Sequence, residues 1–335
     1  MEAKYESLHN HTTASDGLQT HKQVLKSAEA NGFGVIAFTD HDRLPDEADL
    51  KKLREYDGPV KWFTGLEISS GLPIELGGGS SSNLHILGLF TDPTNQALVD
   101  HCIKAQTARG DRMEQIVKNL NNLGLTVSVD DTLAASAGES VGRPHIVRAI
   151  NSHPENAKVI EDIRAQMEAR AKEDASVAMD YTLMLERPAS DYPYRLFLSS
   201  DAFIRNVYVD YLYWVDMDLA VELIRGAGGV AVVAHWYTAA RTINAQMLEE
   251  MIRQGRLDGV EIMGNPDNPH ARRAEPTLTK LVAETGCIQT FGIDGHRPED
   301  IPSFASDRRL AERTVGQTKK IIDRARPNLS WSNLA

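Results

Sequence analysis

Six short apolar runs, bounded by Gly, Asp or Pro, constrain the fold of this chain more than any other feature. They cover residues 35–39, 60–64, 84–90, 230–234, 259–263 and 287–293. Helical patterns lie between them: Thr20 can cap a helix that runs through Ala30, and another helix is expected over residues 216–227, before two glycines. Short buried strands that alternate with helices are typical of an α/β architecture.

This alternation lapses between about residues 94 and 216, where helical patterns cover residues 95–123, 145–152 and 155–178. A run rich in Tyr and Phe follows them, which we interpret as the core of a small domain, with a base-stacking platform as the alternative. A chain of 335 residues suits one large domain with an insertion. We therefore predict a first domain part at residues 1–98, an inserted helical cap at 99–215, a second domain part at 216–300 and a C-terminal extension at 301–335.

Charge and composition limit the partners of the chain. Its 36 basic and 47 acidic residues give a net charge of -11, which argues against binding a long nucleic acid or an anionic membrane but permits a small anion. Cys102 and Cys287 are the only cysteines, too few for a disulfide framework. No secretory signal and no apolar run of about 20 residues is present, so we expect a soluble cytoplasmic protein whose oligomeric state stays open.

Histidine and carboxylate side chains recur near the expected strands. His9 and His11 are two residues apart in what should be the first strand, where a period of two directs both side chains to one face. Functional residues of α/β barrels and parallel sheets gather at the carboxyl ends of the strands. The candidate metal ligands are His9, His11, Asp16, His41, Glu67, His85, His235, Asp294 and His296.

This set of residue types predicts a metal centre. A single His at a strand end is more often structural than a ligand, but many ionisable groups beside buried strands would each need a partner or a metal. Six imidazoles and three carboxylates favour Mn, Fe or Zn over Mg. Nine ligands exceed the needs of one ion, so we expect two or three divalent ions with Glu67 as a bridge between two of them.

Seven short motifs carry a resemblance to a known family. They are HNHT (9–12), SDG (15–17), TDHD (39–42), GLEI (65–68), NLHILG (83–88), AH (234–235) and DGH (294–296). In this order they resemble the PHP (polymerase and histidinol phosphatase) superfamily of metal-dependent phosphoesterases. The resemblance implies a distorted (β/α)7 barrel with a mainly helical inserted cap, and a bi- or trinuclear metal centre at the carboxyl end of its strands.

The resemblance also implies how the ligands divide among the ions. His9, His11, Glu67 and Asp294 would hold one ion, Glu67, His85 and His235 a second, and Asp16, His41 and His296 a third. The chain departs from the usual family pattern at Ser7, where an Asp is usual, at Ile293, where a Ser is usual, and in the segment 236–241, where Pro and Arg usually follow the His. We therefore expect an intact metal site and an altered substrate pocket.

The segment VGRPHIV (141–147) is similar to a motif in the inserted domain of small-molecule phosphatases of this superfamily. That likeness implies that Arg143 and His145 face the substrate phosphate, and a planar guanidinium suits bidentate phosphate binding. The alternative for Arg143 is a structural salt bridge.

We expect these groups to hydrolyse a small phosphate ester, with a hydroxide that bridges two metal ions as the nucleophile. Glu67, Arg143 and His145 are the expected catalytic residues. The leading substrate is a phosphomonoester, with a nucleotide bisphosphate as one form of it. The alternatives are a cyclic phosphodiesterase, a carbon–nitrogen hydrolase and a non-catalytic metal-binding regulatory module.

Overall fold

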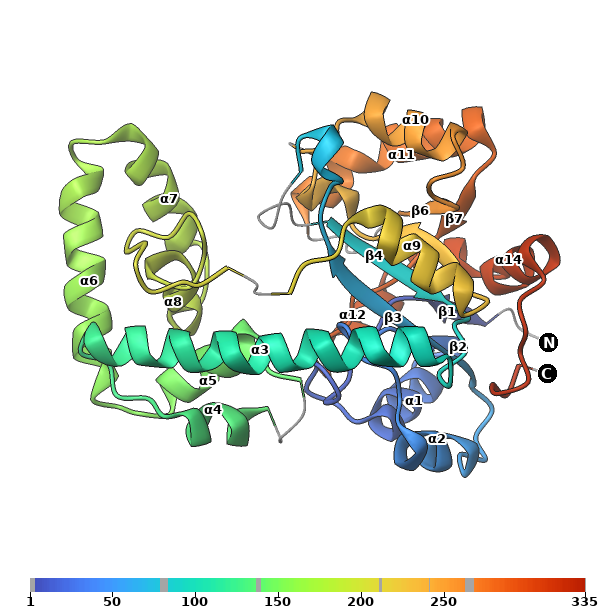
Figure 1. The fold of residues 1–335 in the computed structure, drawn as a ribbon, viewed down its shortest axis with the longest axis horizontal. Coiled ribbons are helices and arrows are strands. Elements are labelled where there is room, and N and C mark those ends of the chain that lie inside the picture. The colour runs from blue at the N-terminus through green and yellow to red at the C-terminus, as the bar shows by residue number, and fades with distance from the viewer. Residues whose placement is uncertain are drawn as a thin grey trace. The chain divides into compact units, whose positions relative to one another are not determined.

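The computed structural model describes residues 4–78, 84–136, 140–210, 213–240, 242–262 and 268–334. The chain divides into two compact units, Met1–Ala105 with Trp214–Ala335 (unit 1) and Gln106–Tyr213 (unit 2). The long helix α3 (Gln96–Asn122) contains the first boundary between them (Figure 1). No described helix combines the length and the apolar character that a membrane span requires.

Unit 1 contains one seven-stranded sheet and most of the helices. Its strands are β1 (Tyr5–Ser7), β2 (Phe33–Phe38), β3 (Lys61–Ser70), β4 (Leu84–Leu89), β5 (Val230–Val233), β6 (Gly259–Glu261) and β7 (Ile288–Thr290). Its helices, apart from α3, are α1 (His21–Ala30), α2 (Glu47–Arg54), η1 (Ile74–Leu76), α9 (Met217–Gly226), η3 (Trp236–Thr238), α10 (Ala245–Arg253), α11 (Pro269–Thr285), α12 (Asp300–Ser306), α13 (Arg308–Ala311), η4 (Glu312–Thr314) and α14 (Gln317–Ala325). The predicted mixed α/β fold is confirmed.

The strands follow one another in chain order across the sheet. β1, β2 and β3 are parallel, and so are β5, β6 and β7, whereas β4 is antiparallel to both of its neighbours. Backbone hydrogen bonds also join the segments that follow β1 and β7: Leu8 N donates to Phe291 O at 3.1 Å, and His11 N donates to Gly295 O at 2.9 Å. The ends of the first and last strands therefore meet.

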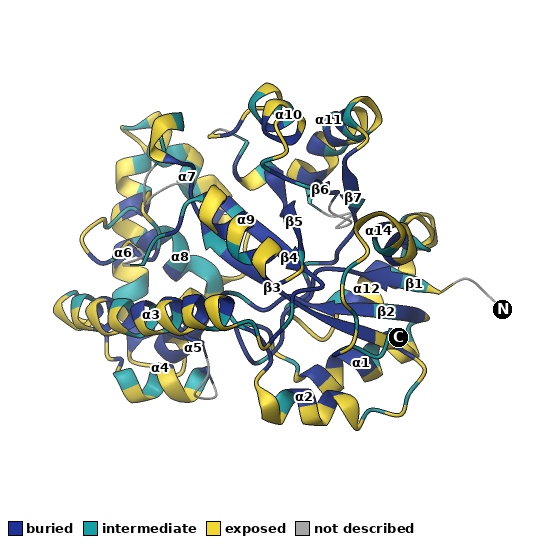
Figure 2. Ribbon diagram, turned by 45° about the vertical axis from the view of Figure 1, so that its right-hand side comes forward, coloured by how far each residue is buried: buried dark blue, intermediate teal, exposed yellow. Residues whose placement is uncertain are grey.

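The residues that the sequence indicated as helix caps form capping hydrogen bonds in the structure. Thr20 accepts a hydrogen bond from Gln23 N and forms a capping box with it, so α1 begins and ends where predicted. Asp216 accepts from Leu219 N at 2.8 Å to start α9, and Gly228, with a φ of +75°, turns the chain toward β5. Figure 2 shows β3 and β4 deeply buried beside α9, whose outer face is exposed.

The first strand is shorter than predicted. β1 ends at Ser7, so His9 and His11 lie after the strand and not within it. The reason is local: Asn10 Nδ2 donates to Ser7 O at 3.1 Å and to Ala37 O at 3.0 Å, which occupies carbonyls that a longer ladder would use. In the sixth strand, the predicted residue Met263 lies outside the described residues.

Unit 2 is helical in its described parts. It contains the remainder of α3 with α4 (Val129–Ala135), α5 (Arg143–Asn151), α6 (Asn156–Ala171), α7 (Ala175–Leu185), η2 (Ala189–Asp191) and α8 (Tyr192–Leu196). The predicted helix over 155–178 is wrong as one element, because Asp174 caps α7 and separates it from α6. Phe197 is fully buried in the core of the unit, and Tyr192, Tyr194 and Phe203 pack against that core. Phe197 is thus a core residue, as the sequence favoured, and the other three are partly buried.

The last segment of the chain is part of unit 1. The buried carboxylate of Glu6 accepts hydrogen bonds from Gly316 N at 2.8 Å and Thr318 N at 2.7 Å at the amino end of α14. A carboxylate is favourable there because a helix amino end has unpaired N–H groups and a partial positive charge. Ile301 and Phe304 of α12 join the core around Phe33.

Candidate metal centre

All nine predicted ligands lie in unit 1, on strands of the sheet or in the segments that follow them. His41 follows β2, Glu67 lies within β3, and His235 follows β5. Asp294 and His296 follow β7 at a greater distance, and His85 is the second residue of β4. Because β4 is antiparallel, its amino end lies beside the carboxyl end of β3, where Ser69 pairs with His85. The reversed strand therefore brings His85 to the same edge of the sheet.

Glu67 is the centre of the group. Its Oε1 lies 2.8 Å from both His85 Nδ1 and His235 Nε2. Its Oε2 lies 3.2 Å from the nearest ring nitrogen of each of three other histidines, His9, His11 and His41. Five imidazoles thus share one carboxylate whose side chain is 0 % exposed.

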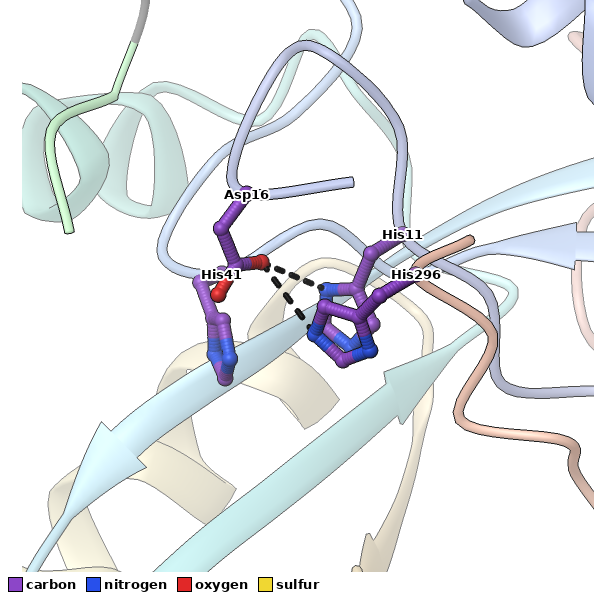
Figure 3. A group of neighbouring side chains, drawn as sticks. All are labelled: His11, Asp16, His41 and His296. Carbon is purple, nitrogen blue, oxygen red and sulfur yellow. Dashed lines mark ion pairs between the residues drawn. The ribbon is translucent and has the colours of Figure 1, made fainter. Parts of the chain in front are cut away.

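The donor atoms form three overlapping groups, each compact enough for a cation. They are His9, His11, Glu67 and Asp294; His11, Asp16, His41 and His296; and His41, Glu67 and His85. The first coincides with the set expected for one ion. The second adds His11 to the set expected for another ion, and Figure 3 shows Asp16 directed toward the rings of His11 and His296. In the third, His41 takes the place expected for His235.

The exposed fraction of the side chains differs across the group. His9, His11 and Glu67 have side chains that are 0 % exposed, whereas His85 is 26 % and His296 is 30 % exposed. The cluster is therefore sealed on the side of His9 and open to solvent on the side of His85 and His296. A substrate can reach it from the open side.

Burial and neighbouring charges lower the pKa of some of these residues and raise the pKa of others. Burial raises the pKa of Glu67, but His41, His9 and His85 outweigh that effect and hold it well below the usual range. Burial lowers the pKa of His296, but Asp16 and Asp294 outweigh it and raise the pKa to about 10. For His41 burial is the dominant effect and lowers the pKa to about 3. The carboxylates are anionic, and the imidazoles divide between charged and neutral forms.

The donor set fits divalent cations. Nδ1 of His41 is buried and lies 3.2 Å from Glu67 Oε2, but it forms no hydrogen bond with any described residue. His9 Nε2 and His11 Nε2 face each other at 3.0 Å, an arrangement in which two lone pairs can converge on one ion. Buried charged groups of this kind are paired or coordinate metals, and imidazole with carboxylate suits Mn, Fe or Zn.

Two ligand positions have strained backbones. His235 has a φ of +26° and Asp294 a φ of +52°, both in the left-handed region that residues other than Gly rarely adopt. Such conformations persist where the surrounding structure determines them, and they concentrate at functional sites. Both side chains reach the cluster: His235 Nε2 lies 2.8 Å from Glu67 Oε1, and Asp294 shares a donor group with Glu67.

The sequence analysis missed Glu261 as a residue of this site. Glu261 is 1 % exposed at the end of β6, its Oε1 lies 2.9 Å from His9 Nδ1, and its Oε2 accepts a hydrogen bond from His235 N at 2.9 Å. Its position within the apolar run 259–263 could have identified it, because a carboxylate in a buried strand needs a partner for its charge.

Asp40 is a second buried carboxylate that positions a candidate ligand without being one. It accepts hydrogen bonds from Thr12 N at 2.7 Å and Ser15 Oγ at 2.6 Å, and so fixes the turn that carries Asp16.

The positions that depart from the family pattern have local structural roles. Ser7 Oγ donates to Asn10 Oδ1 at 3.0 Å and accepts from Ile293 N at 3.2 Å. After His235 the chain forms η3, and Trp236 Nε1 donates to Ile243 O at 2.7 Å. Arg241 lies outside the described residues.

Arg143 and His145 lie in unit 2, at the amino end of α5. His145 is 1 % exposed, and its Nδ1 accepts a hydrogen bond from Gly142 N at 2.8 Å, so this ring caps the helix. Arg143 is exposed and forms no ion pair within the described part of unit 2.

No family model matches the chain. It is 27% identical over 303 residues to a 5′-3′ exoribonuclease of Haemophilus influenzae, covering 89% of this chain and 92% of that protein. It is 25% identical to a 3′,5′-nucleoside bisphosphate phosphatase of Chromobacterium violaceum, covering 96% of this chain and 93% of that protein. It is 28% identical to a phosphoribosyl 1,2-cyclic phosphate 1,2-diphosphodiesterase of Eggerthella lenta, covering 88% of this chain and 96% of that protein.

Solved structures show the same fold. A protein of Bifidobacterium adolescentis, provisionally named a metal-dependent phosphoesterase, matches with a TM-score of 0.61 and 23% identity over 88% of each chain. These relatives and neighbours agree with the motifs and with the cluster around Glu67. Together with the site, these similarities support a PHP-like phosphoesterase.

Proposed function

We propose that this protein hydrolyses a small phosphomonoester, with a 3′,5′-nucleoside bisphosphate as the leading substrate, by means of two or three divalent ions. The observation that carries the proposal is Glu67, a fully buried carboxylate whose two oxygens contact five imidazoles. A phosphatase of that substrate class is among the relatives that match nearly the whole chain. Mn, Fe and Zn are the ions that the donor types favour.

The proposal assigns the candidate ligands to separate metal ions. His9, His11, Glu67 and Asp294 would hold one ion, Glu67, His85 and His235 a second, and Asp16, His41 and His296 a third. Divalent ions supply an activated water at neutral pH and neutralise the charge of the phosphate. The exposed side of the cluster, at His85 and His296, is where the phosphate enters.

Arg143 and the helical unit complete the proposal. Arg143 binds the nonbridging oxygens of the phosphate, as its exposed guanidinium at the start of α5 permits. His145 lies two residues after Arg143 at the same helix end, where its Nδ1 accepts a hydrogen bond from Gly142 N, and we propose it as a second residue that faces the phosphate. We further propose that unit 2 is the inserted substrate domain and that the sheet is a distorted barrel, which the hydrogen bonds between the segments after β1 and β7 support.

A second candidate function is exonucleolytic cleavage from a 5′ end of RNA. Relatives from Haemophilus influenzae and Escherichia coli are named 5′-3′ exoribonucleases, so the relatives do not support the exclusion of long nucleic acids. The charge argument concerned binding along a backbone, whereas an exonuclease requires only the terminal nucleotides in its site. A cyclic phosphodiesterase also remains among the relatives' activities, while the relatives do not favour a carbon–nitrogen hydrolase or a non-catalytic module.

A substrate panel tests the proposal. Protein loaded with Mn, Fe or Zn is given a 3′,5′-nucleoside bisphosphate, a ribose cyclic phosphate, a short 5′-phosphorylated RNA and an amide, and product formation is measured. We expect metal-dependent phosphate release from the bisphosphate with the highest kcat/KM. Mononucleotide release from RNA at a higher kcat/KM would favour the exonuclease, and turnover of the amide alone would refute phosphoesterase activity.

A further inference from the structure

Glu261 makes two contacts to the metal cluster without belonging to any of its donor groups. One oxygen, Oε1, lies 2.9 Å from Nδ1 of His9, and the other, Oε2, accepts a hydrogen bond from the backbone N–H of His235 at 2.9 Å. The side chains of His9 and Glu261 are both 0 % exposed. Glu261 therefore links two histidines that lie 226 positions apart in the chain.

Gly292, which follows β7, leaves room for this contact. A Cβ atom on Gly292 would lie 2.5 Å from Glu261 Oε1 and 2.3 Å from His9 Cβ. Both distances are far below ordinary van der Waals separation, so only Gly permits His9 and Glu261 to approach each other here. Residues from the ends of β1, β6 and β7 thus converge on one hydrogen bond.

The contact determines which nitrogen of His9 is available. A neutral imidazole carries its proton on one nitrogen, and a carboxylate at Nδ1 favours the proton there. The lone pair is then on Nε2, which faces Glu67 Oε2 at 3.2 Å and Asp294 Oδ1 at 3.4 Å. Metal-binding histidines commonly have such a carboxylate, and its removal weakens metal affinity about 10–100-fold.

The second contact acts on His235. Its backbone φ of +26° is unfavourable for an L-residue, and the hydrogen bond from its N–H to Glu261 helps to maintain that conformation. The same conformation places His235 Nε2 2.8 Å from Glu67 Oε1. The two oxygens of Glu261 thus orient two ligands, each of which contacts a different oxygen of Glu67.

We infer that Glu261 is a positioning residue that sets the metal affinity of the cluster by fixing the tautomer of His9 and the backbone of His235. The inference rests on the proposed function only in that the cluster binds divalent ions. It does not depend on which phosphate ester is hydrolysed. Glu261 itself contacts neither the ions nor the substrate in this role.

The test compares Glu261→Gln with a matched control, Glu6→Gln. Glu6 is also a buried carboxylate whose two oxygens accept backbone N–H groups, but its partners are Gly316 and Thr318. Gln has one acceptor oxygen and one NH2 donor, so Glu261→Gln must lose one of its two hydrogen bonds. The Kd for Mn²⁺ and Zn²⁺ of the metal-free proteins and their thermal stability are measured together.

We expect Glu261→Gln to weaken binding of at least one ion about 10–100-fold, while Glu6→Gln lowers the melting temperature and leaves the metal Kd unchanged. Glu261→Asp, which keeps the charge on a shorter side chain, is the second variant if Gln prevents folding, and the same loss of affinity is expected. Wild-type Kd values in Glu261→Gln, equal losses in both Gln variants, or no metal binding by the wild-type protein would overturn the inference. Metal binding without hydrolysis of any phosphate ester would instead refute the proposed function alone.

Discussion

Replacing Glu67 by Gln should weaken the binding of two metal ions at once. Glu67 belongs to two of the three donor groups, and each of its oxygens lies within 3.2 Å of imidazoles from different strands. The substitution keeps the shape of the side chain but removes one negative charge from both groups. A unit charge about 4 Å from another is worth about 4 kcal/mol at an effective dielectric constant of about 20. At about 1.4 kcal/mol per factor of ten, each Kd should rise about 10³-fold.

Isothermal titration of metal-free protein with Mn²⁺ or Zn²⁺, with elemental analysis after dialysis, measures this loss. Asp16→Asn is the control, because Asp16 belongs to only one donor group, which does not contain Glu67. It should remove about one equivalent and leave the others in place. If Glu67→Gln retains two equivalents with Kd values within tenfold of the wild type, Glu67 does not bridge two ions, and the reasoning from its contacts is wrong.

Three further outcomes are expected. Protein grown with ample Mn, Fe and Zn should contain at least two equivalents of metal per chain, and elemental analysis that finds one or none would contradict the assignment of the cluster. Arg143→Ala should leave metal content unchanged and lower kcat/KM on the best phosphate ester about 10²-fold, with partial rescue by Lys; a structural salt bridge would instead lower thermal stability with normal turnover. Gly292→Ala should force His9 and Glu261 apart, destabilise the protein by about 1–3 kcal/mol and weaken metal binding, so wild-type values of both in thermal and metal titrations would refute that steric argument.

The sequence predicted the strands of the sheet and the two capped helices because those signals are local. Apolar runs and caps depend on neighbouring residues, as α1 and α9 show. The direction of β4 was not predictable in this way, because an apolar run has the same pattern whichever way the strand runs. His85 opens its apolar run, and the antiparallel pairing places that amino end beside the carboxyl end of β3.

The candidate site was predictable as a set of residues but not as a set of contacts. Ligand-type side chains at strand ends stand out in the sequence, whereas the link from Glu261 to His9 joins residues 252 positions apart and leaves no spacing rule. The three donor groups also depend on the positions of individual side-chain atoms, which place His41 and not His235 in the third group. The role of Arg143 stays a prediction, because it concerns a residue of the other compact unit.

The long chain separation within the cluster has a consequence for biosynthesis. At about 5–20 residues per second, roughly a quarter of a minute to one minute passes between synthesis of His9 and of His296. During that time the first imidazoles have left the ribosome but lack the partners that follow β5 and β7. The full set of ligands therefore exists only after β7 and the segment that follows it have been synthesised. A nascent or truncated product without the last strand cannot retain the full set of ions, so the bound metal distinguishes finished molecules from incomplete ones.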